Sequence, residues 1–299
     1  MTAHPFRFGV VTARAETGEE WVGKARRIES LGYATLLTPD VLRHTLAPLP
    51  ALAVAAAATR TLRVGTYVIA NDLRNPVLLA KDAATIDLLS GGRLELGIGA
   101  GRPGAGEDNS MLGIPFDSGA QRVARLAESL GVLKALLAGE PATATGPHYS
   151  VNAAEIAPRP VQRPHPPILI AAGRRRLMSL AAREADIVAM GVPPTESEDA
   201  LADKVAWIRD AAPERFDKLE LHLNLMAVGD RVPQYMEAQM GLSAERLAGM
   251  KAVSALVGTT DEMCETLLRR RERLGISYVA VGDELMDVLA PVVERLAGR

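Results

Sequence analysis

Short apolar runs alternate with longer amphipathic runs along the whole chain of 299 residues. Helical patterns lie between these short runs, and this alternation is typical of βα units with parallel strands. Eight short runs are predicted as strands: Phe6–Val11, Tyr33–Leu37, Leu62–Ile69, Leu94–Gly99, Ile168–Ala172, Asp186–Met190, Leu219–Val228 and Tyr278–Val281. Eight units favour one α/β domain over residues 1–299, a (β/α)8 TIM barrel, and an open doubly wound sheet is the alternative.

The helical patterns between these runs have recognisable ends. Asn75 suits the N-cap position before Pro76, and Gly32 suits the end of the first helix. The predicted helices are Thr17–Leu31, Pro76–Leu89, Ser118–Leu137, Arg174–Glu184, Glu196–Asp210, Thr260–Leu274 and Glu284–Leu296. Two further segments exceed the bare repeat, at 139–167 and at 230–258, the second with a helix near Ser243–Met250. We expect both to be ordered insertions at one end of the barrel.

The glycine-rich stretch LELGIGAGRPGAGED begins at residue 94, and Gly99, Gly101 and Gly104 fit the pattern GxGxxG. A dinucleotide-binding turn needs its third glycine in a helix that packs against the strand. Here Pro103 precedes that glycine, and no helical pattern is expected until about Ser118. We therefore interpret the stretch as a strand end where the backbone passes close to a flat ligand. A flexible surface loop is the alternative.

Composition argues against several classes of function. The net charge of −2 indicates neither a nucleic-acid partner nor an anionic membrane surface. Cys264 is the single cysteine, and the first residues lack the pattern of a secretory signal, so we expect a cytoplasmic protein. The five histidines form neither HxH nor HxxxH, so we expect no metal site, and a metal-dependent hydrolase is disfavoured.

Six segments carry a more specific signal: Thr38–Asp40, Ala47–Thr59, Leu62–Gly101, Leu112–Asp117, Arg159–Gly173 and Leu180–Val188. In these segments the chain resembles the luciferase-like monooxygenase superfamily, and within it the subgroup of probable coenzyme F420-dependent (deazaflavin) oxidoreductases. The resemblance implies a barrel that transfers a hydride between F420 and a small organic substrate. An FMN-dependent monooxygenase supplied with flavin by a reductase is one alternative, and a non-catalytic cofactor-binding barrel is another. We also expect a homodimer.

The resemblance further implies where the cofactor lies. Tyr67 and Val68 match the positions of a non-prolyl cis peptide that backs the ring in this family. The implied cofactor-binding residues are Asp40, Tyr67, Val68, Ile69, Ala70, Gly99, Ala100, Gly101, Arg102, Ala171, Ala172, Gly173, Arg174 and Arg175.

The last part of that set has a physical basis of its own. Gly173 precedes a predicted helix, and Arg174, Arg175 and Arg176 follow it. Free N–H groups at a helix start, together with guanidinium groups, suit a phosphate, although a solvated run of charges is the alternative. The sequence IAAG resembles the corresponding sequence of deazaflavin-dependent members, and this favours F420 over FMN. Both cofactors carry a phosphate on a ribityl chain, so FMN remains open.

The candidate catalytic residues are Asp40, His44 and Glu107. In deazaflavin-dependent members a histidine follows the aspartate that matches Asp40, but here Val41 stands in its place. His44 could substitute for that histidine, and Glu107 or Asn109 could face the ring or the substrate. For His44, Glu107 and Asn109, the alternative is that each is a loop side chain without a catalytic role.

Overall fold

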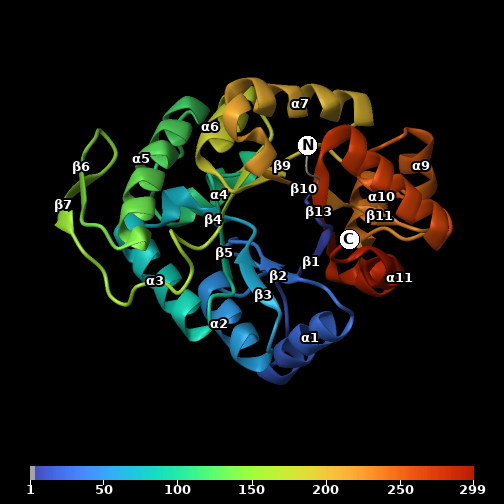
Figure 1. Ribbon diagram of the computed structural model, residues 1–299, viewed down its shortest axis with the longest axis horizontal. Helices are drawn as coiled ribbons and strands as arrows, with labels where there is room; N and C mark the ends of the chain where they lie inside the picture. Colours follow the sequence, from blue (N-terminus) through green and yellow to red (C-terminus); the bar gives the residue numbers. More distant parts are fainter. Residues whose placement is uncertain (1–3) are drawn as a thin grey trace. The chain divides into compact units, whose positions relative to one another are not determined.

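The computed structural model describes residues 4–299, and the order of its elements is that of a (β/α)8 barrel (Figure 1). This confirms the predicted fold class. The residues group into two compact units, which are described in turn. The first unit holds residues 4–12, 23–37 and 172–299, and the second holds residues 13–22 and 38–171.

The strands of the first unit form a parallel sheet. Their order is β2 (Thr35–Thr38), β1 (Arg7–Val11), β13 (Ile276–Gly282), β10 (Glu220–Leu225) and β9 (Ile187–Met190). Val279 of β13 lies opposite Phe8 on one side and opposite Leu223 on the other. Most positions of these strands are buried, which explains why the sequence shows continuous apolar runs instead of alternation.

The second unit is built around a central strand that is buried along its whole length. Its parallel strands are β3 (Arg63–Thr66), β4 (Ile69–Ala70), β5 (Leu94–Gly99) and β8 (Ile168–Ala172). Strand β5 pairs with β3 and β4 along one edge and with β8 along the other. The predicted strand Leu62–Ile69 is therefore divided in two, because the ladder is interrupted at Tyr67 and Val68.

Three of the helices begin at capping side chains, and one of these, Asn75, is a predicted N-cap. The side chain of Asn75 accepts a hydrogen bond from the Val77 amide, and Ser118 and Thr259 each form a capping box. The predicted helices appear as α1 (Gly18–Ser30), α3 (Pro76–Leu89), α5 (Gly119–Ala138), α6 (Arg175–Glu184), α7 (Glu198–Ala211), α10 (Thr260–Leu274) and α11 (Met286–Leu296). Among residues 4–299, no helix combines the length and apolar character that crossing a bilayer requires.

The sequence pattern does not predict α2 (Pro48–Ala58) or α4 (Gly106–Met111). Helix α2 is apolar around its whole circumference, so it shows no helical period. Helix α4 is too short to show a period, although Glu107 and Asp108 suit its first turn. The expectation that no helix begins before Ser118 is therefore wrong.

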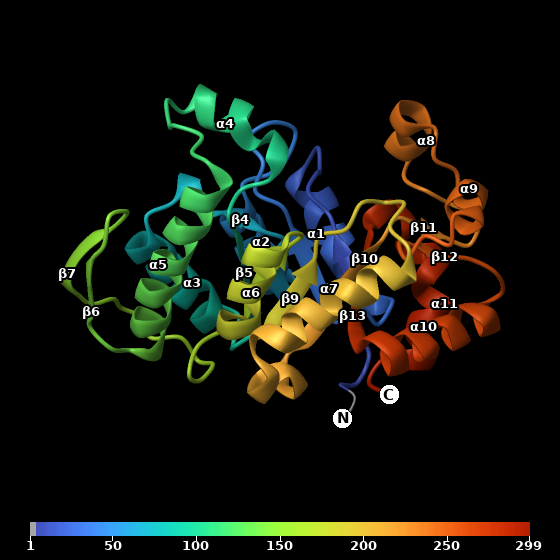
Figure 2. The ribbon, with the colours of Figure 1, turned by 90° about the horizontal axis from the view of Figure 1, so that it is seen from above.

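Both predicted insertions contain ordered elements, but they lie at opposite ends of their strands. The segment 139–167 follows α5 and precedes β8, so it extends the amino end of β8. It contains the antiparallel hairpin of β6 (Ala142–Thr145) and β7 (Ser150–Ala154), which lies beside α5 in Figure 2. The segment 230–258 follows β10 and β11 (Ala227–Val228), so it extends a carboxyl end. The expectation of one shared end is wrong.

The second insertion has a small core of its own. It contains α8 (Gln234–Met240), α9 (Ala244–Gly249) and β12 (Ala255–Leu256), and β12 pairs with β11. Met236, Leu242, Leu247 and Ala252 are buried together in this segment. The segment is therefore packed structure and not an open loop.

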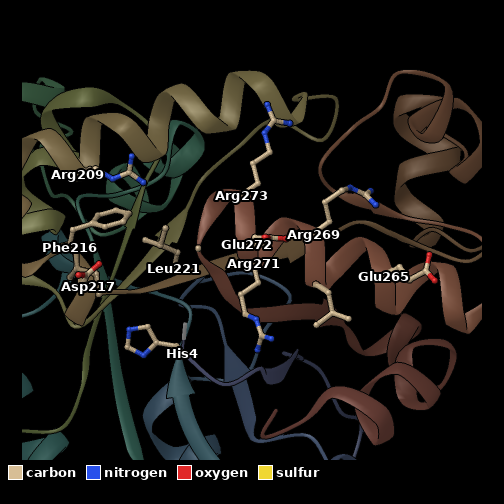
Figure 3. A pocket seen from close by; sticks show the side chains of 13 residues that line it. His4, Arg209, Phe216, Asp217, Leu221, Glu265, Arg269, Arg271, Glu272 and Arg273 are labelled. Atoms are coloured by element: carbon tan, nitrogen blue, oxygen red, sulfur yellow. The ribbon is translucent and has the colours of Figure 1, made fainter. Parts of the chain in front are cut away.

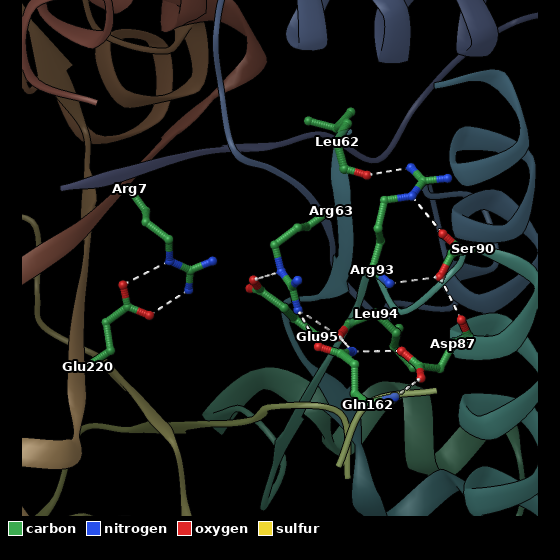
Figure 4. Close-up of polar contacts among 10 residues, drawn as sticks. All are labelled: Arg7, Leu62, Arg63, Asp87, Ser90, Arg93, Leu94, Glu95, Gln162 and Glu220. Atoms are coloured by element: carbon green, nitrogen blue, oxygen red, sulfur yellow. Dashed lines mark hydrogen bonds and ion pairs between the residues drawn. The ribbon is translucent and has the colours of Figure 1, made fainter. Parts of the chain in front are cut away.

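Buried polar groups at the amino ends of the strands are paired within each unit (Figure 4). In the first unit, the guanidinium of Arg7 donates to both carboxylate oxygens of Glu220, at 2.9 and 2.5 Å. In the second unit, Arg63 donates to Glu95 at 2.6 Å and to Gln162 at 3.0 Å. Such pairing offsets the cost of burying charge.

Asp87, on α3, fixes the segment that leads into β8. Its fully buried carboxylate accepts from the main-chain N–H groups of Val161 and Gln162, at 2.7 and 2.9 Å. It also accepts from the side-chain amide of Gln162 at 2.6 Å. One carboxylate thus satisfies three donors in a segment that has no strand or helix of its own.

We expect Asp87→Ala to lower the free energy of unfolding by about 2–4 kcal/mol, because it leaves buried N–H donors without an acceptor. Urea unfolding measures this change. Asp82→Ala, at an exposed position of the same helix, is the matched control and should change stability by less than about 0.5 kcal/mol. Equal effects of the two substitutions would contradict the anchoring role of Asp87.

Candidate functional site

Asp40 lies just beyond the carboxyl end of β2, and its side chain is 6% exposed. Its Oδ1 accepts from the Arg74 guanidinium at 2.9 Å, and its Oδ2 accepts from the main-chain N–H of Ala70 at 3.1 Å. Burial raises the pKa of the Asp40 carboxyl, while Arg74 and the Ala70 amide act in the opposite direction. A carboxyl with a raised pKa beside strand ends is suited to holding a proton.

The interruption between β3 and β4 lies next to this carboxyl. The peptide bond between Tyr67 and Val68 is cis, as the resemblance implies. The Tyr67 N–H donates to the carbonyl of Thr38 at 2.7 Å, and burial raises the pKa of the Tyr67 phenol. Ala70 follows in β4 and carries the N–H that meets Asp40. We call the segment Tyr67–Ala70 the bulge. The end of β2 and the bulge are therefore joined by direct hydrogen bonds.

The glycines of β5 allow this bulge to approach closely. A Cβ atom on Gly97 would lie 1.9 Å from the carbonyl oxygen of Thr66, and one on Gly99 would lie 2.9 Å from a methyl group of Val68. The Thr66 hydroxyl donates to the Gly97 carbonyl at 2.6 Å and is within 2.8 Å of the Gly97 amide that donates to it. Gly97 and Gly99 therefore serve the fit between β5 and the bulge.

The loop after β5 continues with exposed charged side chains. Gly101 has a φ of 82°, a conformation that favours glycine. Arg102 forms an ion pair with Asp108 at 3.0 Å, and Glu107 of α4 forms one with Arg43. The Glu107 side chain is 76% exposed, so its carboxylate is largely solvated.

His44 lies in the loop between β2 and α2. It is exposed and has a φ of 68°, and its carbonyl accepts from Nε of Arg14 at 2.7 Å. The catalytic roles predicted for His44 and Glu107 stay predictions. Their exposure contrasts with the burial of Asp40.

The predicted anion-binding turn follows β8. A Cβ atom on Gly173 would lie 2.7 Å from the carbonyl oxygen of Gly191, so this position requires glycine. Helix α6 begins directly afterwards, and the side chain of its N-cap residue, Arg174, makes no capping hydrogen bond. Arg174 and Arg175 are exposed, and Arg175 lies 6.0 Å from the Trp207 ring. The first N–H groups of α6 and two guanidinium groups are thus available to an anion.

A family model described as luciferase-like monooxygenase matches residues 1–240. The chain belongs to this family. It is an oxidoreductase with the (β/α)8 fold of luciferase-like proteins.

The chain is similar in sequence to two curated relatives, and it is similar in fold to one solved structure. An F420-dependent glucose-6-phosphate dehydrogenase of Nakamurella multipartita is 29% identical over 280 residues, which cover 88% of this chain and 81% of the relative. A 4-hydroxyprotoasukamycin monooxygenase of Streptomyces nodosus subsp. asukaensis is 33% identical over 298 residues, covering 94% and 74%. The structure of a coenzyme F420-dependent tetrahydromethanopterin reductase from Methanopyrus kandleri has a TM-score of 0.78 and 16% identity, covering 98% and 99%.

The second unit of this luciferase-like protein brings Asp40, Ala70 and Gly99 together, whereas the predicted residues from Ala172 onward belong to the first unit. Hydrogen bonds join Asp40 to Ala70, and pairing between β4 and β5 sets Ala70 opposite Gly99. Ala171 and Ala172 end β8, and Gly173, Arg174 and Arg175 follow at the turn into α6. Residues 4–299 contain no cluster of three or more histidine, cysteine, aspartate or glutamate side chains that could hold a metal ion.

Arg74 is a site residue that sequence reasoning missed. Its guanidinium binds Asp40, although the two residues are far apart in the sequence. One signal was available in the sequence: Arg74 directly precedes Asn75, the N-cap of α3. That helix start follows the carboxyl end of a strand, where site residues of a barrel lie. Arg43 was missed as well, and the sequence gives no pattern that pairs it with Glu107.

The raised pKa of Asp40 has a consequence for stability. The native protein holds this proton more tightly than the unfolded chain does, so the carboxyl's contribution to stability is present below its ordinary pKa of 3.8. That contribution is lost as the pH rises through the native pKa. We therefore expect the stability of Asp40→Asn to rise relative to that of the unsubstituted protein as the pH increases.

Urea unfolding at pH values from about 4 to about 8 measures this trend. Asp210→Asn, at an exposed position of α7, is the control and should show no such trend. A relative stability of Asp40→Asn that falls with pH would mean that Arg74 outweighs burial.

Proposed function

We propose that the protein is a cytoplasmic oxidoreductase that transfers a hydride between coenzyme F420 and a small organic substrate. Family membership supports redox chemistry, and matching relatives include both F420-dependent and flavin-dependent enzymes. A deazaflavin or flavin cofactor is therefore supported, and the preference for F420 rests on the turn Ala171–Gly173. The single cysteine supports a reducing compartment.

The residues present fit such a cofactor. The bulge at Tyr67–Ala70 forms a wall beside Asp40, and Gly99, Ala100 and Gly101 leave strand β5 with few side-chain atoms near its end. The turn Ala171–Arg175 offers N–H groups and guanidinium groups to a phosphate. When bound, the deazaflavin supplies the hydride chemistry, and the protein supplies orientation, exclusion of water and proton handling.

The observation that carries the proposal is the environment of Asp40. Its carboxyl is buried, its pKa is raised by that burial, and two hydrogen bonds fix its position at the bulge. It can hold a proton at Oδ1 or Oδ2 and pass that proton to a substrate group. In deazaflavin-dependent family members, an aspartate followed by a histidine is expected to have this role. Val41 replaces the histidine, so Asp40 takes the role alone in this proposal.

We expect F420 to bind and its fluorescence to be quenched, with FMN binding more weakly. Titration of the purified protein with each cofactor measures both affinities. Tight FMN binding without an F420 response would favour the FMN-dependent monooxygenase, which the family description and the monooxygenase relative already support. Tight F420 binding without turnover on any tested alcohol, aldehyde or enone would favour a non-catalytic carrier.

We expect Arg174→Glu to weaken cofactor binding by about 1.5–3 kcal/mol, or ~10- to 100-fold in Kd, because it replaces a charged hydrogen-bond donor with a repelling carboxylate. The same titration measures this change. Arg183→Glu, in the last turn of the same helix, makes the same change of charge away from the turn. Equal affinities for the two variants would mean that Arg174 is only a solvated side chain.

We further propose a homodimer that packs through α2 and α3. Val54 of α2 and Leu78 and Leu89 of α3 are 46%, 64% and 75% exposed. Exposed apolar side chains on neighbouring helices are typical of a protein interface, and α2 is apolar around its whole circumference. A cavity of about 380 Å3 between the two helices could receive partner side chains.

Leu78→Glu combined with Leu89→Glu should shift the protein to monomers, as measured by sedimentation velocity, because charges would be buried in the interface. Met240→Glu, at an exposed position of α8, should not. A monomeric unsubstituted protein at micromolar concentration would contradict the homodimer.

A further inference from the structure

A cavity of about 600 Å3 lies in the first unit, apart from the site described above (Figure 3). Among its lining residues, His4 precedes β1, Leu219 precedes β10 and Gly275 precedes β13. The cavity therefore borders the amino ends of these strands. The candidate redox residues follow carboxyl ends instead, and none of them lines this cavity.

One wall of the cavity is apolar. Phe216, Leu219 and Leu221 are buried side chains that line it, the first two from the segment before β10 and Leu221 from β10 itself. Leu268 of α10 also lines the cavity but is 41% exposed. An apolar body lying against these four side chains would remove Leu268 from water at little conformational cost.

Two half-buried polar side chains line the same cavity, and both present nitrogen atoms. The Nε2 atom of His4 is buried and has no hydrogen-bond partner among residues 4–299. Arg271 stacks on the ring of Phe6 at 4.2 Å and donates one Nη1 bond to the main-chain oxygen of Arg299. Stacking covers a face of the guanidinium and leaves its edge able to donate to an anion. Figure 3 shows His4 and Arg271 in the lower half of the view.

The remaining charged side chains of the cavity lie nearer to water. The three carboxylates, Asp217, Glu265 and Glu272, are all exposed, so solvent compensates their charge. Arg273 is exposed and already paired with Asp199 at 2.5 Å. Of the two polar groups that lack full solvation, Arg271 can only donate hydrogen bonds, and His4 Nε2 donates when it carries the ring proton. This favours an anion over a cation.

From this arrangement we infer that the cavity binds an amphipathic carboxylate. The carboxylate accepts from the Arg271 guanidinium and from His4 Nε2, and the alkyl or aryl body lies on Phe216, Leu221 and Leu268. The site is independent of the cofactor and of the proposed redox reaction, because its residues belong to none of the elements that carry those groups.

Decanoate is a suitable probe, and isothermal titration calorimetry of the full chain without added cofactor measures its binding. We expect Arg271→Gln to weaken decanoate binding ~10-fold or more, since one charged hydrogen-bond donor is lost. Leu268→Glu, at an exposed position that should not affect folding, should weaken binding similarly by repelling the carboxylate. Arg183→Gln, at an exposed position of α6, should leave binding unchanged.

Circular dichroism establishes that each variant is folded. Unchanged affinity in Leu268→Glu would overturn the inference, even if Arg271→Gln failed to fold. Equal affinity for decylamine would overturn the choice of an anion. Displacement of decanoate by FMN or F420 would assign the binding to the redox site and would also overturn the inference. Loss of cofactor binding alone would refute the proposed function and leave this cavity unaffected.

Discussion

The close packing of β5 against the bulge fixes the positions of the neighbouring groups in the second unit. No side chain can stand at residue 97, because a Cβ atom there would lie 1.9 Å from the Thr66 carbonyl oxygen. The Thr66 hydroxyl bonds both the N–H and the carbonyl of Gly97, which fixes the two strands at this distance. Ala70 then falls opposite Gly99, and its N–H reaches Asp40. The position of the buried carboxyl therefore depends on a glycine in a neighbouring strand.

Much of the fold could be predicted from the sequence because parallel strands and amphipathic helices have distinct patterns. Strand β5, helix α3 and helix α10 have the predicted bounds, and capping side chains at Asn75 and Thr259 set where the two helices begin. Helix α2 could not be predicted from periodicity, because an apolar run shows none. The split of the strand at Tyr67 and Val68 was not visible in the local pattern either, since an irregular ladder is set by the neighbouring strand.

The site was predictable in part, and mostly through resemblance to known proteins. That resemblance gave the cis peptide at Tyr67–Val68, which no local sequence pattern indicates. The glycine-rich stretch was interpreted as an approach to a flat ligand, which stays a prediction. The structure adds a second reason for glycine at residues 97 and 99, because their near contacts are Thr66 and Val68. The partner of Asp40 could not be predicted, because the ion pair with Arg74 depends on how two loops converge.

The insertion with its own small core has an evolutionary consequence. Residues such as Met236 and Leu247 are buried within the insertion itself. Packing of the parallel sheet therefore does not depend on the outer surface of the insertion. Substitutions on the outer faces of α8 and α9 can accumulate at low cost in folding. The sequence of this segment can therefore diverge faster than the sequences of the strands, without loss of the fold.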